Sequence, residues 1–123
     1  MPPEEVQRDL VRQWLHKADQ DMVAAEILLK SDSTLPSVIA FHSQQAVEKY
    51  LKAILVRHQV YFPKTDDIGK VLDMVAQVEP AIASALQEST ALTPFGAEGT
   101  YPGDAPEVLP GEETRAVELA LGL

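Results

Sequence analysis

A row of polar side chains lies along one side of the helix expected near the middle of the chain. The row consists of His42, Gln45, Lys49 and Lys52. At ~100° per residue, these spacings keep the four side chains on one side of a helix over about three turns. Lys ammonium groups and a Gln amide so arranged can bind a phosphate and the edge of a base. The row therefore predicts a ligand-binding surface.

The same residues allow two other interpretations. In the first, the row is an exposed polar face on which Glu48 and Lys52 form an i,i+4 ion pair that adds little stability. In the second, the role is structural, and Gln44 and Gln45 satisfy buried backbone groups or bridge to a neighbouring helix. The sequence leaves all three interpretations open.

A further candidate for ligand contact is Tyr101, in the Gly- and Pro-rich segment 93–111. The density of Gly and Pro predicts a long loop there. Such a loop is uncommon in a compact domain and often functional. Tyr101 can fold over a site beside the central helix, or it can pack against the bundle.

Metal and cofactor chemistry find little support. The chain contains no cysteine, so disulfides and thiolate metal sites are excluded. His16 and His42 can approach each other if two helices pack antiparallel, but no further spacing of Asp, Glu or His completes a metal site. No Gly-rich phosphate loop, nucleophile arrangement or pair of carboxylates stands out. We expect no metal and no cofactor.

Hydrophobic periodicity predicts an all-α protein in a single domain, 1–123. Apolar residues at three- and four-residue spacing indicate helices over 4–30, from 37 to about 57–60, 68–78, from 79–80 to about 92, and 112–121. Thr65 or Asp66 is expected to cap the third helix. No segment alternates with period two for long. The predicted architecture is an antiparallel up-and-down bundle of four to five helices, with the long loop before the last one.

The second helix has an unusually wide apolar arc, which predicts partners on more than one side. The arc comprises Ile39, Ala40, Ala46, Val47, Tyr50, Leu51, Ala53 and Ile54. The polar row and Glu48 occupy the narrow sector that remains. We therefore expect this helix at the centre of the bundle.

Charge and hydropathy limit the classes of partner. The formal net charge is -9 and the pI is about 4.6, which argues against general nucleic-acid binding. No apolar run approaches the ~20 residues of a membrane span, and residues 1–5 do not resemble a secretion signal. A cytoplasmic location without membrane attachment is expected.

Several segments, in order, resemble the HEPN domain family. They are 14–21 (WLHKADQD), 41–53 (FHSQQAVEKYLKA), 62–65 (FPKT) and 101–103 (YPG). The chain departs from the family pattern in three places. The family's Thr-His-Asp-Leu type segment is Thr65-Asp66-Asp67-Ile68 here, an Arg is replaced by Thr100, and the last helix is short.

The resemblance implies a non-catalytic, nucleotide- or substrate-binding accessory subunit. Its partner would be a separately encoded small nucleotidyltransferase, in a pair of the toxin–antitoxin type, and the chain itself would form a homodimer. The polar row and Tyr101 would then contribute to ligand contact.

Two alternatives remain: a ribonuclease toxin with a diverged site, or a protein-interaction module without a small ligand. Catalytic HEPN proteins carry an Arg and a His separated by four to six residues, near their final helices. Arg8, Arg12, Arg57 and Arg115 have no His at that spacing, and Arg12 and His16 have only three residues between them. The absence of this motif favours the non-catalytic interpretation over the ribonuclease.

Overall fold

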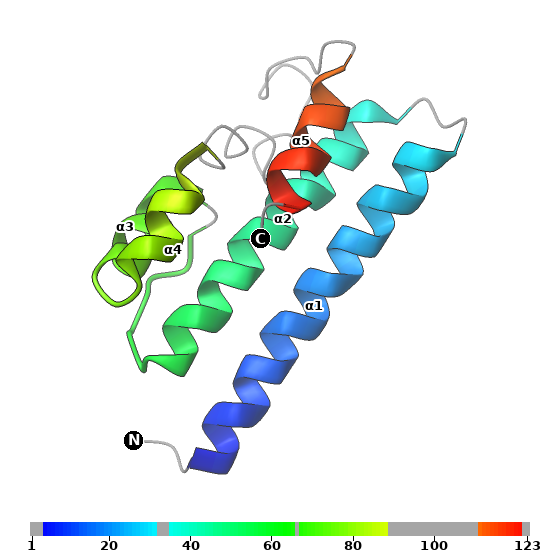
Figure 1. Cartoon of the computed structure of the whole chain (residues 1–123). Helices are drawn as coiled ribbons and strands as arrows, with labels where there is room; N and C mark the ends of the chain where they lie inside the picture. Colours follow the sequence, from blue (N-terminus) through cyan, green and yellow to red (C-terminus); the bar gives the residue numbers. More distant parts are fainter. Residues whose placement is uncertain (1–3, 32–34, 66, 89–110, 122–123) are drawn as a thin grey trace.

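Two long antiparallel helices, α1 (Glu4–Lys30) and α2 (Pro36–Arg57), form the frame of the molecule (Figure 1). The computed structural model describes residues 4–31, 35–65, 67–88 and 111–121. Glu4 and Glu5 lie in the first turn of α1 and Lys30 in its last, which suits the helix dipole at both ends. Pro36 lies in the first turn of α2, where its missing N–H costs no hydrogen bond.

α2 is the central helix, as its wide apolar arc predicted. It packs against α1, α3 (Ile68–Ala76) and α5 (Glu112–Leu121). Val47, Leu51 and Leu55 are the largest apolar side chains of α2 that are fully buried in the core. Burial extends into the polar sector, because Ser43, Gln44, Glu48 and Lys52 are buried as well. The polar row therefore borders other elements instead of lying open to solvent along its whole length.

The third and fourth helices differ in detail from the prediction. Asp67 caps α3, its Oδ1 accepting from the backbone N–H of Lys70 at 3.3 Å, whereas Thr65 or Asp66 was expected. Thr65 instead accepts from the backbone N–H of Asp67 at 3.1 Å, and Asp66 lies outside the described residues. α4 (Pro80–Ala85) is shorter than expected. It ends where the N–H of Leu86 is shared between two carbonyls of the last turn.

α5 begins and ends where predicted and lies against α2 and α1. Its buried side chains are Ala116, Val117 and Ala120. Gly111 precedes it with a φ of 93°, a conformation that favours glycine. The predicted loop 93–111 lies almost wholly outside the described residues.

The described residues contain five helices and no strand, which confirms the all-α class. None of these helices combines the length and apolarity that crossing a membrane requires.

Candidate functional site

Asp21 of α1 connects two members of the polar row. The residue is 9% exposed and lies among the buried side chains of Ala18, Met22 and Ala25. His42 Nδ1 lies 2.8 Å from Asp21 Oδ1, and Lys49 Nζ donates to Asp21 Oδ2. A carboxylate oxygen accepts from an N–H, so Nδ1 of His42 is the donor in this contact. One carboxylate from α1 thus fixes two side chains of α2.

The side chains of His42 and Lys49 remain partly accessible. They are 29% and 21% exposed. An ammonium group has three N–H donors, and Asp21 occupies one of them. The arrangement can therefore offer a fixed cation and an imidazole to an anionic ligand at the edge between α1 and α2.

Lys52 is enclosed instead. Its ammonium group pairs with Glu48 one turn earlier in α2, and the two side chains are 7% and 8% exposed. Lys52 Nζ also lies 5.5 Å from the ring centroid of Trp14 and 5.7 Å from that of Phe62. The two rings meet edge to face at 6.2 Å. Attraction of the ammonium group to the ring faces joins α1, α2 and the connector after α2. A ligand would reach Lys52 only if one of these rings moved.

The two remaining candidates are Gln45 and Tyr101. Gln45 Nε2 donates to Gln44 Oε1 at 2.6 Å, and Gln44 is fully buried. Tyr101 lies outside the described residues. The structure thus unites His42 and Lys49 on Asp21, places Gln45 between them along α2, and separates Lys52 in a buried ion pair. Ligand binding by these residues stays a prediction.

Two acidic residues of α1 were not identified from the sequence as partners of α2. Besides Asp21, Asp19 accepts a hydrogen bond from the Tyr50 hydroxyl. Burial raises the pKa of Tyr50 from 10.0 to about 12, with the hydrogen bond and the nearby charges of Asp19 and Glu26 adding to the effect. The signal in the sequence that could have revealed these two partners is charge complementarity. Acids in the segment 19–26 face a basic segment 42–52 if the two helices are antiparallel.

Another ion pair lies at the end of α2. His58 Nε2 lies 3.1 Å from Glu79 Oε1, which ties the end of α2 to the start of α4. Among the residues that the structure describes, no three His, Asp or Glu side chains gather closely enough to hold a metal ion.

Comparison with known proteins gives two matches. A profile of the HEPN domain family matches residues 11–121. A protein of Methanocaldococcus jannaschii named "Putative toxin MJ1304" is 39% identical over 49 residues, which are 40% of this chain and 31% of that protein. The match thus spans about a third of the length of that relative. No solved structure matches the chain.

Proposed function

Since the chain belongs to the HEPN domain family, we propose that it is a non-catalytic member that binds a nucleotide or a related substrate. It acts as the accessory subunit of a separately encoded small nucleotidyltransferase, in a pair of the toxin–antitoxin type. The chain departs from the ribonuclease pattern, because none of its four arginines has a His at the catalytic spacing. The relative named as a toxin supports the assignment to such a pair.

The observation that carries the binding role is the cluster of Asp21, His42 and Lys49. Packing between α1 and α2 holds the cluster in place, so little side-chain freedom is lost when a ligand binds. His42 and Lys49 are partly exposed at the surface, whereas Asp21, which orients them, is buried. Such a cluster can bind a phosphate through the remaining ammonium donors of Lys49.

Calorimetric and thermal-shift titration with a panel of nucleotides tests this role. A ligand that binds only the folded state raises the unfolding midpoint by mass action. We expect one nucleotide to raise the midpoint of the wild type and of Lys70→Ala, a control that removes an exposed Lys from α3. The rise is expected to be smaller in Lys49→Ala than in either of these two proteins.

Each variant is compared with its own ligand-free midpoint, because Lys49→Ala also removes a partner of Asp21. If no nucleotide shifts the wild type, the binding role fails, and a protein-interaction module becomes the better interpretation.

The partner is tested separately by light scattering after mixing the chain with a small nucleotidyltransferase encoded beside it. Two unchanged masses would contradict the proposed pairing.

The relative named as a toxin also favours a second candidate, a ribonuclease with a diverged site. Arg115 is the only arginine in the described part of the last helix, and its guanidinium pairs with Glu88 at 2.8 Å and with Glu118 at 3.7 Å. The proposal predicts no RNA cleavage in the absence of added metal. Cleavage that disappears in Arg115→Ala would replace the accessory role by the enzymatic one.

Self-association belongs to the same proposal. Val23 and Ile27 lie one turn apart on α1 and are 54% and 62% exposed. Exposed apolar side chains on a neighbouring pair of helical positions favour contact with a second copy of the chain. The proposed oligomer is a homodimer.

A further inference from the structure

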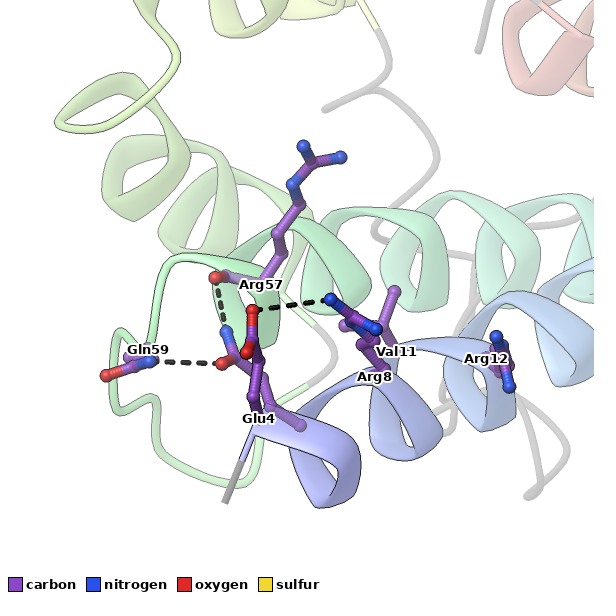
Figure 2. A pocket seen from close by; sticks show the side chains of 7 residues that line it. Glu4, Arg8, Val11, Arg12, Arg57 and Gln59 are labelled. Carbon is purple, nitrogen blue, oxygen red and sulfur yellow. Dashed lines mark hydrogen bonds and ion pairs between the residues drawn. The ribbon is translucent and has the colours of Figure 1, made fainter. Parts of the chain in front are cut away.

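A second polar site lies at the end of the α1–α2 pair, away from the polar row. A cavity of about 570 Å³ opens between the first turns of α1 and the end of α2. Seven residues line it: Glu4, Gln7, Arg8, Val11, Arg12, Arg57 and Gln59. Figure 2 shows Arg8 and Arg12 on successive turns of α1, with Arg57 on the facing end of α2.

The cavity gathers three of the four arginines of an acidic chain. Only Arg8 is in an ion pair there, with Glu4 at 3.3 Å, and both side chains are largely exposed. The guanidinium groups of Arg12 and Arg57 make no ion pair with any residue in the described ranges. Arg8 and Arg12 also stand at i,i+4, where like charges destabilise a helix. The free protein thus concentrates positive charge at this place and compensates only part of it, through Glu4, although its net charge is -9.

The floor of the cavity is held by hydrogen bonds between the two helices. Gln7 Nε2 donates to the backbone oxygens of Val56 at 3.1 Å and Arg57 at 2.5 Å. Gln59 Nε2 in turn donates to Gln7 Oε1 at 3.0 Å. The last carbonyls of α2 are therefore covered by an amide, which reduces their repulsion of an anion in the cavity.

Gln59 has an unusual backbone conformation, and its side chain takes part in the hydrogen bonds just described. The N–H of Val60 bonds to Leu55 O and the N–H of Gln59 to Val56 O, the pattern that closes a helix on a left-handed residue. That residue is normally Gly, but here it is Gln59 with a φ of 57°. A non-glycine residue in this conformation is strained, and such strain concentrates at functional sites. Gly at this position would relieve the strain but would lose the side-chain contact with Gln7.

We propose that this cavity is a binding site for a small oligophosphate, such as the di- or triphosphate group of a nucleotide. Planar guanidinium groups match phosphate oxygens in pairs, and three of them suit a ligand with several charges better than a single carboxylate. The volume falls in the range of small-molecule sites. A long polyanion such as RNA is disfavoured because the rest of the acidic protein would repel it.

The site shares no residue with the cluster around Asp21, so this inference goes beyond the proposed function. It holds whether or not Lys49 binds a nucleotide. The two sites are told apart by which substitutions abolish binding.

Isothermal titration calorimetry with inorganic tripolyphosphate at low ionic strength tests the proposal. We expect one site per chain, with affinity that falls as salt rises. Replacing both unpaired arginines (Arg12→Gln with Arg57→Gln) should weaken binding at least ~10-fold, because charge-assisted hydrogen bonds are lost. The two side chains are exposed, so the unfolding midpoint of the double variant should match the wild type within the scatter of replicates.

Arg115→Gln is the matched control, since it makes the same substitution at an exposed arginine outside the cavity. It should leave tripolyphosphate binding unchanged. The proposal is overturned if tripolyphosphate does not bind, if the double variant binds as well as the wild type, or if Arg115→Gln is equally impaired. Loss of binding in Lys49→Ala alone would place the ligand on the α2 cluster and overturn the cavity site.

Two further titrations separate the sources of the phosphate. Tighter binding of ATP than of tripolyphosphate would support a nucleotide as the ligand, and equal binding would support the oligophosphate group itself. A single-stranded RNA that binds the cavity more tightly than either would overturn the proposal in favour of RNA. The same double variant identifies the cavity in each titration.

Discussion

At the scale of single residues, Asp21 connects the two longest helices through charge. The side chain of Asp21 is 12% exposed, so its carboxylate has lost most of its hydration. Its two partners on α2 compensate for that loss, because each donates a charge-assisted hydrogen bond. An amide in place of the carboxylate keeps one oxygen acceptor and turns an NH2 donor toward the other partner, so one of the two partly buried groups loses its acceptor.

We therefore expect Asp21→Asn to lower the free energy of unfolding by about 2 kcal/mol, the range for hydrogen bonds to charged groups. Urea denaturation followed by circular dichroism measures the change. Asp73→Asn is the control, because Asp73 is exposed on α3 and its substitution should have little effect. Combining Asp21→Asn with Lys49→Met should give a smaller loss than the sum of the two single losses. Strict additivity would show that the two residues are not coupled.

Tyr50 gives the molecule a pH dependence in the alkaline range. Burial, followed by the hydrogen bond and charge of Asp19, raises the pKa of Tyr50 from 10.0 to about 12. A raised pKa in the folded state means that the protonated phenol stabilises the fold below pH ~10. That contribution is lost as the pH rises from ~10 to ~12.

The difference in urea midpoint between the wild type and Tyr50→Phe should therefore shrink as the pH rises through that window. Tyr61→Phe serves as the control, because Tyr61 is 92% exposed and has no such contact among the described residues. A difference that stays constant up to the pH of alkaline unfolding would contradict the shift.

At the scale of elements, the end of α2 depends on a conformation that its sequence does not favour. Gln59 has a φ of 57°, whereas Gln77 at the end of α3 has a right-handed φ of -73°. Gly adopts the first conformation without strain, but in the second it only adds freedom to the unfolded chain.

Gln59→Gly should consequently be more stable than Gln59→Ala by about 1 kcal/mol, since neither variant keeps the contact with Gln7. At Gln77 the order should be reversed, with the Ala variant the more stable. Thermal and urea unfolding of the four variants give the comparison. The same order at both positions would mean that the left-handed residue is not strained.

The elements were more predictable than the contacts between them. The bounds of α1 and α5 follow from hydrophobic periodicity and from the Pro and Gly residues beside them, and the wide apolar arc placed α2 at the centre. The predicted cap of α3 was wrong by one or two positions, because Thr65 and Asp67 both bond to backbone N–H groups at the start of the helix. Local spacing identified His42 and Lys49 on one helix. It could not identify Asp21, because that contact depends on the register between α1 and α2.

The same limit hid the cavity at the end of the pair. Arg12 and Arg57 are far apart in the sequence, and only the packing of α1 against α2 brings them to one place. That packing uses small side chains, since Ala18, Ala25, Ala40 and Ala46 are all fully buried. Small residues allow close approach but do not themselves specify a register, so the sequence pattern leaves the position of one helix along the other undetermined.

At the scale of the whole molecule, the exposed apolar side chains of α1 are the proposed contact surface of the homodimer. Val23 and Ile27 are more than half exposed, although most apolar residues of the neighbouring helix α2 are buried or half-buried. In a two-fold dimer the same patch occurs on both copies, so a charge introduced near the axis meets its own copy across the interface. Like charges at such a contact oppose association strongly.

Ile27→Lys should therefore convert the proposed dimer into a monomer while the helix content by circular dichroism stays the same. Sedimentation equilibrium over a range of concentrations measures the mass. Val6→Lys is the matched control, because Val6 is also exposed on α1, at 46%, but lies near its other end. It should leave the dimer intact. A monomeric wild type would refute the homodimer, and equal dissociation of both variants would move the interface away from Val23 and Ile27 to a surface that extends along α1.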